Sequence, residues 1–255
     1  MNKKLDLKNP VTLNEKIQWL KLYDRNPQYT VLVDKYAVRD YIANTLGEKY
    51  LIPLIDVYNA VDDIEWDKLP NRFVLKCTHG SHCNIVCSDK SKLDIKQAKR
   101  NLKFWMKQNW YFLGREWPYK NVTPRIVAEE YITDEPNKDT LTDYKFYCFN
   151  GEAEVVLLCF DRETDKPKFY FFDKNWNLKR YNLQGKNAPE GFTIDKPEKI
   201  DEMFEIAEKL SEGFKFVRID LYCSNGNIYF GEFTLYPASG FDSNRLPEAD
   251  KMFGK

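Results

Sequence analysis

The sequence predicts an α+β fold with mostly antiparallel strands and a two-lobed outline, and three observations predict it. Short apolar stretches typical of strands are interspersed with longer stretches in which apolar residues recur at helical spacing. Asn-Gly pairs at 150–151 and 225–226 separate neighbouring apolar stretches, which favours hairpins. The segment Thr133–Thr140 is rich in turn-forming residues, so it is expected to be a lobe boundary or a flexible loop.

The first elements are expected to be helices. Thr12-x-x-Glu15 is a capping box, and the apolar residues after it recur at helical spacing as far as Tyr23. A second helix is expected from about Asp34 to Leu46, because its apolar residues share one face and Gly47 follows as a stop.

The middle of the chain is expected to hold two strands and a long helix. Phe73–Lys76 and Ile85–Cys87 are short apolar runs on either side of the loop 77–84. Asp94-x-x-Gln97 then provides an N-terminal cap for an amphipathic helix that continues to Met106.

The second half of the chain is expected to consist mainly of strands. The segments with strand character, in chain order, are Arg125–Ile132, Tyr144–Phe149, Glu154–Phe160, Lys168–Phe172, Phe216–Leu221 and Ile228–Thr234. One helix is expected over Asp201–Leu210, because Gly213 follows it as a C-terminal stop.

The composition indicates a globular protein without a membrane span. Of its 255 residues 43% are hydrophobic and 31% charged, and 39 Lys plus Arg balance 39 Asp plus Glu. This balance argues against nucleic acid as a bulk partner but allows a small polyanion in a local pocket. The longest apolar run, Val155–Phe160, is far shorter than the roughly 20 residues that span a bilayer. No secretion signal begins the chain, and six dispersed cysteines are typical of reduced thiols, so a cytoplasmic location without stable membrane insertion is expected.

A lysine followed by small residues predicts a place for phosphate groups. Lys76 ends an expected strand, and Gly80 and Ser81 lie in the next loop, where small residues expose backbone N–H groups. An ordinary hairpin tip is the alternative. Structural zinc is disfavoured because two separated ligand pairs are lacking among the residues that would have to bind it, which are Cys77, His79, His82, Cys83 and Cys87.

Charged residues interrupt the last two strands. Arg218 and Asp220 are two residues apart, so they share one strand face. A three-residue turn over Ser224–Gly226, with a positive φ at Gly226, would pair Arg218 with Glu232 and put Asp220 diagonally beside Glu232. A two-residue turn would send Glu232 to the opposite face. On one face these groups suit Mg²⁺ and phosphate, and a buried salt bridge is the alternative.

Two adjacent acids end the strand that precedes the expected lobe boundary, in Glu129-Glu130-Tyr131-Ile132. The ordinary interpretation is one exposed and one paired acid. A nucleotide-binding hinge would instead use backbone groups here to bind adenine, with a nearby acid accepting hydrogen bonds from the ribose hydroxyls.

The order of these motifs resembles the ATP-grasp superfamily, and most closely its TupA-like branch, found with teichuronopeptide and capsular polysaccharide synthesis. The stretch from Val217-Arg218-Ile219-Asp220 through Glu232-Phe233-Thr234-Leu235-Tyr236-Pro237 to Gly240 is similar to the family signature R-x-D … E-x-N-x-x-P-G. Asp34-Lys35, the Lys76 strand with its Gly80-Ser81 loop, and Ala128–Ile132 resemble the family's phosphate-binding and adenine-binding segments in the same order.

The resemblance implies a set of nucleotide-binding residues. Lys35 and Lys76 would hold the phosphates of ATP, and the loop with His79, Gly80 and Ser81 would close over them. The residues implied at adenine and ribose are Glu129, Glu130, Tyr131, Ile132 and Asp143.

The resemblance also implies a catalytic and metal-binding set. Asp220, Glu232 and Thr234 would bind Mg²⁺, with Thr234 standing where many ATP-grasp ligases have asparagine. Arg218 would steady the transferring phosphoryl group, and Lys145 would face the same site.

The implied activity is an ATP-dependent carboxylate–amine ligase, in which a carboxylate accepts the γ-phosphate and an amine attacks the acyl phosphate. The implied substrates are a uronic acid of a surface polysaccharide, or another small-molecule carboxylate, and an amino acid or amine. Other enzymes of polysaccharide biosynthesis are the implied partners. A phosphotransferase acting on a sugar, and a non-enzymatic sugar-binding protein associated with glycosyltransferases, remain alternatives.

The resemblance implies three regions. These are a reduced N-terminal helical region over residues 1–70, a small ATP-grasp lobe over 71–132, and a large lobe with the metal site over 133–255.

Overall fold

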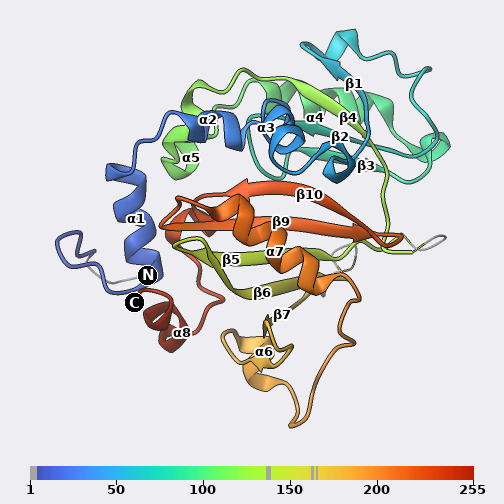
Figure 1. Ribbon diagram of the computed structural model, residues 1–255. Helices are drawn as coiled ribbons and strands as arrows, with labels where there is room; N and C mark the ends of the chain where they lie inside the picture. The colour runs from blue at the N-terminus through green and yellow to red at the C-terminus, as the bar shows by residue number, and fades with distance from the viewer. Residues whose placement is uncertain (1–4, 136–138, 162–163, 165) are drawn as a thin grey trace. The chain divides into compact units, whose positions relative to one another are not determined.

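The computed structural model describes residues 5–135, 139–161, 164 and 166–255. The chain forms two compact units: Asn26–Thr133 is one, and the segment up to Arg25 joins Asp134–Lys255 in the other. Each unit has its own sheet and helices, which Figure 1 shows in sequence colours. Residues 1–70, which the sequence predicts as a region of their own, are shared between these units.

The unit 26–133 is built on a four-stranded antiparallel sheet in the order β1-β4-β2-β3. Its strands are β1 Leu54–Tyr58, β2 Phe73–Cys77, β3 Asn84–Cys87 and β4 Ile126–Glu130. Along β2 the side chains of Phe73, Leu75 and Cys77 alternate into the core. The helix α4, Ile95–Met106, adds Ala98 and Leu102 to the same core.

The helix expected over 34–46 is shorter in the structure, where α3 covers Val38–Thr45. A separate short helix, α2, Gln28–Val33, precedes it. The side chain of Asp34 accepts hydrogen bonds from the N–H groups of Tyr36 and Ala37. Those bonds stabilise a turn between the helices, because a short Asp side chain competes with helical backbone bonding. The expected helix therefore starts four residues late.

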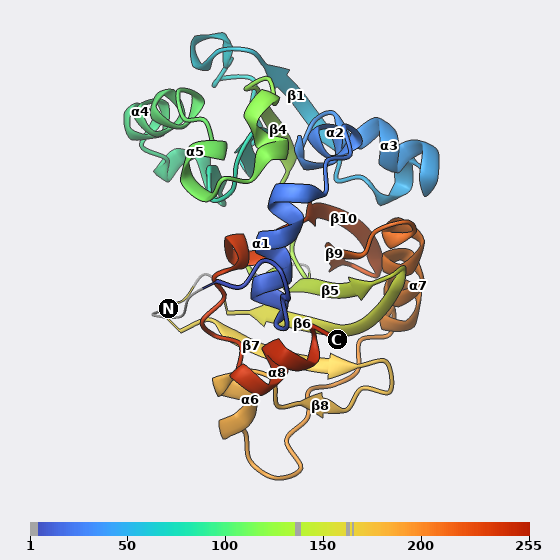
Figure 2. The same cartoon turned by 90° about the vertical axis from the view of Figure 1, so that its left-hand side faces the viewer.

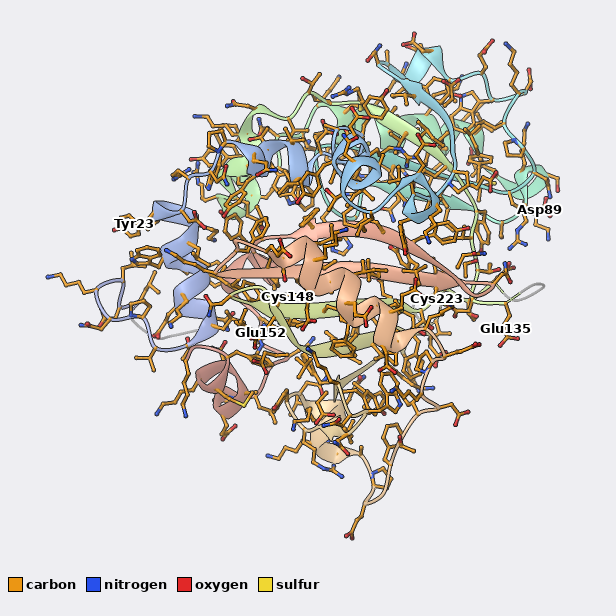
Figure 3. The ribbon with its side chains drawn as sticks, in the orientation of Figure 1. Tyr23, Asp89, Glu135, Cys148, Glu152 and Cys223 are labelled. Carbon is orange, nitrogen blue, oxygen red and sulfur yellow. The ribbon has the colours of Figure 1, made fainter. Side chains whose placement is uncertain are left out.

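The second unit is built on a six-stranded antiparallel sheet in the order β10-β9-β5-β6-β7-β8. Its strands are β5 Asp143–Phe149, β6 Glu152–Phe160, β7 Lys168–Asp173, β8 Leu178–Lys179, β9 Phe216–Ser224 and β10 Asn227–Thr234. The helix α7, Ile200–Ser211, buries an apolar face that packs against β5, β6 and β9. Cys148, labelled in Figure 3, lies in this interface, where its Sγ is 3.8 Å from the carbonyl oxygen of Ala207.

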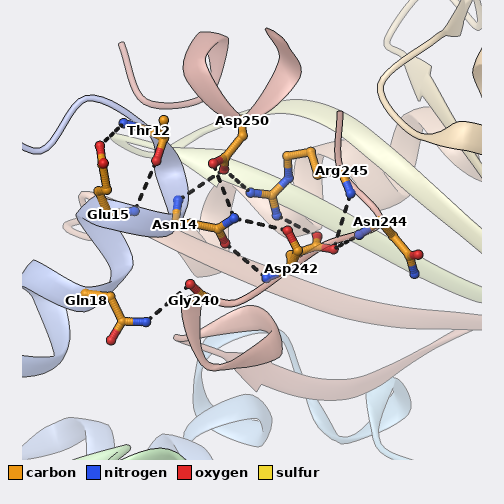
Figure 4. A network of polar contacts seen from close by, with 9 residues as sticks. All are labelled: Thr12, Asn14, Glu15, Gln18, Gly240, Asp242, Asn244, Arg245 and Asp250. Atoms are coloured by element: carbon orange, nitrogen blue, oxygen red, sulfur yellow. Dashed lines mark hydrogen bonds and ion pairs between the residues drawn. The ribbon is translucent and has the colours of Figure 1, made fainter. Parts of the chain in front are cut away.

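The N-terminal helix belongs to the second unit because it packs against the C-terminal helix. They are α1, Leu13–Tyr23, and α8, Pro247–Met252, and Figure 2 shows them side by side. Figure 4 shows the polar network that joins them, in which Asp250 accepts from Asn14 and from the buried Arg245. The capping box of Thr12 and Glu15 is present at the start of α1.

The expected fold class is confirmed, since helices and two antiparallel sheets make up the described residues. The remaining short helices are α5, Tyr111–Gly114, and α6, Leu183–Asn187. Among the described residues no helix has the length and apolar character to cross a bilayer. All six cysteines are free thiols.

Candidate functional site

Three neighbouring strands of the second unit bring six predicted site residues onto one sheet face. β5 provides Asp143 and Lys145, β9 provides Arg218 and Asp220, and β10 provides Glu232 and Thr234. Asp220 lies directly between Lys145 and Glu232 in the ladder, and Arg218 is paired with Thr234. Directly paired residues and residues two apart share a face, so these side chains converge.

Arg218 holds Asp220 in a two-pronged ion pair. Its Nε lies 2.6 Å from Oδ1 of Asp220, and its Nη2 lies 2.6 Å from Oδ2. The same Nη2 donates to the hydroxyl of Thr234 at 3.0 Å and lies 3.8 Å from Oε1 of Glu232. Burial opposes the charge of Arg218, but Asp220 outweighs burial and the pKa of the guanidinium is raised.

Lys145 is a second buried cation on this face. Its Nζ lies 2.6 Å from Asp220 and 3.0 Å from Asp143, both at Oδ2. Burial disfavours the ammonium, yet the charges of Asp143 and Asp220 together raise the pKa of Lys145. The site therefore keeps two positive charges at neutral pH, and both are fixed by Asp220.

The register that joins β9 and β10 differs from the predicted one. Ser224 pairs with Asn227, so the turn has two residues, and both Asn225 (φ 51°) and Gly226 (φ 75°) are left-handed. Of the two turns that the sequence allows, the two-residue turn is therefore the one present, and the positive φ expected at Gly226 is confirmed. The expectation that a two-residue turn would send Glu232 to the opposite face is wrong. A bulge at Gly231 then shifts the pairing by one residue and puts Glu232 directly opposite Asp220, not diagonally beside it.

Glycine is required at this bulge. A Cβ at position 231 would lie 2.9 Å from the carbonyl oxygen of Asp220 and 2.9 Å from Cε2 of Tyr222. The bulge was not predicted, although an isolated glycine inside a strand pattern is its usual signal.

The donor set on this face fits a divalent cation. The face carries three carboxylates and two cations, Lys145 and Arg218, so its net charge is negative by one. The carboxylates are those of Asp143, Asp220 and Glu232. An added positive charge is therefore favourable. Mg²⁺ prefers oxygen ligands and typically uses one or two carboxylates together with phosphate and water. In the described part of the chain no three Asp, Glu, His or Cys side chains form a metal cage. Asp220, Glu232 and the Thr234 hydroxyl lie together on this face, and their assignment as metal ligands stays a prediction.

The other unit holds the predicted Lys76 and Glu129. Lys76 Nζ lies 2.7 Å from Oε2 of Glu129, and Arg39 Nη1 lies 3.1 Å from Oε1. Glu129 is buried between these two cations. Arg39 was not predicted as a site residue, because nothing in the local sequence relates position 39 to position 129.

Lys35 and the Gly80 loop form one local structure in the same unit. Nζ of Lys35 donates to the carbonyl oxygen of Gly80 at 2.7 Å, and its backbone N–H donates to Thr78 at 3.2 Å. Trp110 covers Gly80 so closely that a Cβ there would lie 2.9 Å from the indole ring. Ser81, the next residue, is half-buried.

The side chain of His79 supports this loop from inside the unit. It is buried, and its Nε2 lies 3.1 Å from the carbonyl oxygen of Trp105. Burial lowers the pKa of His79, so the neutral imidazole donates this bond. Its predicted contact with phosphate stays a prediction.

The predicted hinge residues lie at the end of β4. The N–H of Glu130 donates to the carbonyl oxygen of Pro53 at 3.0 Å, so that donor is occupied in this structure. The guanidinium of Arg72 lies 4.2 Å from the ring centroid of Tyr131, and Ile132 is half-buried just after the strand. The assignment of these residues to adenine stays a prediction.

The structure was compared with solved structures. It is similar to D-alanine–D-alanine ligase from Helicobacter pylori, at a TM-score of 0.47 and 12% identity over 94% of this chain and 67% of that one. It is also similar to D-alanine–D-alanine ligase from Bacillus anthracis, complexed with ATP, at a TM-score of 0.47 and 14% identity over 88% of this chain and 62% of that one. For the L-amino acid ligase from Bacillus licheniformis the TM-score is 0.45 and the identity is 16%, over 89% of this chain and 47% of that one. This chain thus spans about half to two thirds of the length of these proteins.

The sequence was also compared with curated proteins and with family models. No curated protein matches it. The family model described as TupA-like ATPgrasp matches residues 15–255, which include both units' candidate residues. The chain therefore belongs to the TupA-like ATP-grasp family.

Proposed function

We propose that this protein is an ATP-dependent ligase that joins a carboxylate to an amine. The observation that supports it most is the charged face of the β5–β9–β10 sheet, where Asp220 is bound by both Arg218 and Lys145 and is paired with Glu232. Phosphoryl transfer needs positioning and charge neutralisation more than covalent help from the protein, and this face has the groups for both. Membership of the ATP-grasp family supports the use of ATP.

The proposed reaction has two steps. A carboxylate oxygen of the first substrate attacks the γ-phosphorus of ATP, and ADP leaves with the electrons of the broken P–O bond. The amine then attacks the acyl carbon and phosphate leaves, so that an amide forms and the amine loses a proton. Arg218 and Lys145 stabilise the negative charge that builds up on the transferring phosphoryl oxygens.

Mg²⁺ belongs to the proposal, with Asp220, Glu232 and Thr234 as its protein ligands. When bound, it supplies neutralisation of phosphate charge. Thr234 suits this role because its hydroxyl lies 3.4 Å from Glu232 and accepts from Arg218, so its oxygen is held next to the carboxylates.

Lys35, Lys76 and the loop with Gly80 and Ser81 are proposed to bind the ATP phosphates. Glu129 orients Lys76 through their 2.7 Å ion pair. Asp143 keeps its proposed place near the ribose, although its carboxylate is buried and bonds to Lys145.

The proposed substrates are a uronic acid of a surface polysaccharide and an amino acid or another amine. The family's description supports the ATP-grasp chemistry, and the polysaccharide substrate rests on the family resemblance alone. A cytoplasmic location, where ATP is available, and association with other enzymes of polysaccharide synthesis complete the proposal.

Trapping the acyl phosphate tests the reaction type. The full chain, ATP, Mg²⁺ and a panel of uronic acids are incubated with hydroxylamine. We expect a hydroxamate with release of ADP and phosphate for the correct acid. Glu232→Gln should abolish the product, whereas Glu248→Gln, which removes an exposed carboxylate from α8, should not. A stable phosphorylated sugar without free phosphate would instead identify a phosphotransferase.

A further inference from the structure

A strongly basic segment lies in a chain that has no net charge. Residues 90–120 contain nine Lys or Arg and only two Asp or Glu, a net charge of +7, whereas the formal net charge of the chain is zero. This segment comprises α4, α5 and the residues around them in the unit 26–133. Trp105 and Trp110 contact the loop with His79 and Gly80, but none of the basic residues of the segment is a candidate site residue. Its charge therefore needs a separate explanation.

Three basic residues of α4 and the one that caps its C-terminus form a stripe on its exposed side. Lys96, Arg100, Lys103 and Lys107 are spaced by four, three and four residues, which places them on one side of a helix, and all four are exposed. The opposite side of α4 is buried in the core. Lys103 pairs with the exposed Asp62 at 2.8 Å, but neither Lys96 nor Lys107 has an ion-pair partner among the described residues.

Large apolar side chains are exposed beside this stripe. Phe104 on α4 is 62% exposed, and Phe112 and Leu113 on α5 are 63% and 65% exposed. α5 begins only a few residues after α4 ends, so the two helices follow each other closely along the chain. Arg115 and Lys120 add charge close by, each within 5.6 Å of the ring centroid of Tyr111.

We propose that α4 and α5 form a docking surface for a bilayer that contains anionic phospholipid. Basic side chains on one helix face attract acidic headgroups, and exposed Phe and Leu side chains enter the boundary between headgroups and acyl chains. Nucleic acid shares the negative charge of such a bilayer, but its phosphate backbone offers no apolar layer for Phe104, Phe112 and Leu113. Binding is peripheral and reversible, because no described helix is long and apolar enough to span. This inference is independent of the proposed ligase activity.

Cosedimentation of the full chain with vesicles tests the surface. We expect binding to vesicles of phosphatidylcholine with 30% phosphatidylglycerol and little binding to pure phosphatidylcholine, and we expect binding to weaken as salt rises. Each basic residue near an anionic surface strengthens binding by about fivefold, so K96Q/R100Q/K107Q should weaken it by about two orders of magnitude. The double variant F112S/L113S should weaken binding while keeping all charges.

A matched control removes the same charge elsewhere. K186Q/K209Q/K251Q neutralises three exposed lysines of the other unit and should bind vesicles nearly as the wild type does. Thermal melting verifies that every variant is folded. The proposal is overturned if the two triple variants behave alike, if F112S/L113S binds unchanged, or if a short DNA duplex binds the α4 stripe more tightly than the anionic vesicles do.

Discussion

Asp220 and Glu232 lie directly opposite each other across the β9–β10 ladder because Gly231 forms a bulge. Without the bulge, the two-residue turn at Asn225-Gly226 would pair Glu232 with Ile219, whose side chain is fully buried. The bulge therefore decides whether the two carboxylates share a face. It also leaves Glu232 half-exposed beside the deeply buried Asp220.

A side chain at position 231 should disrupt this pairing. In Gly231→Ala the new Cβ meets the backbone oxygen of Asp220 at 2.9 Å, so the backbone itself must move. We expect the free energy of unfolding to fall by about 1–3 kcal/mol, as for other overpacked sites. We also expect ATP turnover to fall by more than tenfold, because Glu232 loses its place beside Asp220. Urea unfolding and a turnover assay measure the two effects.

The control for this variant is Gly226→Asn. Gly226 has a positive φ, which Asn tolerates, and a Cβ there meets no atom of the described residues within 4 Å. This variant should retain turnover and lose little stability. Equal loss of turnover in both variants would show that the bulge has no special role.

The residues of this site were predictable, but the geometry that joins them was not. Arg218, Asp220 and Glu232 stand out because charges interrupt apolar strands, and the family resemblance adds Lys145 and Thr234. The pairing depends on whether the turn has two or three residues, and both suit the sequence around Asn225-Gly226. A one-residue shift reverses every side chain of a strand, so this local ambiguity had a large consequence.

Removal of the Lys145 ammonium should leave two carboxylates facing each other. In Lys145→Met the stem keeps its packing, but Asp143 and Asp220 lose a cation that lies 3.0 Å and 2.6 Å away. Breaking a buried ion pair from one side typically costs about 3–5 kcal/mol, and we expect about 3 here because Arg218 still binds Asp220. Urea unfolding measures the loss.

A second substitution shows whether charge explains that loss. Adding Asp143→Asn to Lys145→Met removes one of the two carboxylate charges that faced the ammonium, so the double variant should be more stable than Lys145→Met alone. If the double variant is instead less stable by the sum of both single effects, lost packing is the cause.

Lys76 and Glu232 should each contribute to ATP binding if the proposed function is right. We expect Lys76→Ala and Glu232→Ala each to weaken ATP binding in Mg²⁺ by at least tenfold, which is about 1.4 kcal/mol. Titration calorimetry measures the affinity. Lys68→Ala, which removes an exposed lysine paired with Glu65, should leave it unchanged. Failure of the folded wild type to bind nucleotide would contradict the proposed function itself.

The contacts of Glu129 are a second feature of the candidate site that the sequence predicts only in part. Its acidic neighbour Glu130 and its strand position predicted one paired acid, and the pairing with Lys76 follows from two adjacent strands. Arg39 also binds Glu129, and it comes from α3, ninety positions away in the chain. No periodicity or capping signal reports such a contact, because it depends on how a helix packs on a sheet.

The buried His79 should make stability depend on pH. Burial lowers the pKa of His79 in the folded chain, whereas an unfolded imidazole titrates near about 6.5. Below pH 6.5, roughly the unfolded value, the unfolded chain therefore binds a proton that the folded chain does not. The contribution of His79 to the free energy of unfolding is fully present above that pH. It is lost as pH falls toward the folded-state pKa, and the free energy of unfolding then changes by up to about 1.4 kcal/mol per pH unit.

His79→Gln isolates this contribution, because the amide still offers a donor to the carbonyl oxygen of Trp105 but does not titrate. Urea unfolding at several pH values between about 5 and 7.5 brackets the unfolded imidazole pKa. The wild type should lose more stability toward acid pH than His79→Gln does. His82→Gln removes the exposed histidine of the same loop and serves as the matched control for the loss of an imidazole. If the dependence of unfolding free energy on pH is unchanged in His79→Gln but weaker in His82→Gln, then His82 and not His79 causes it.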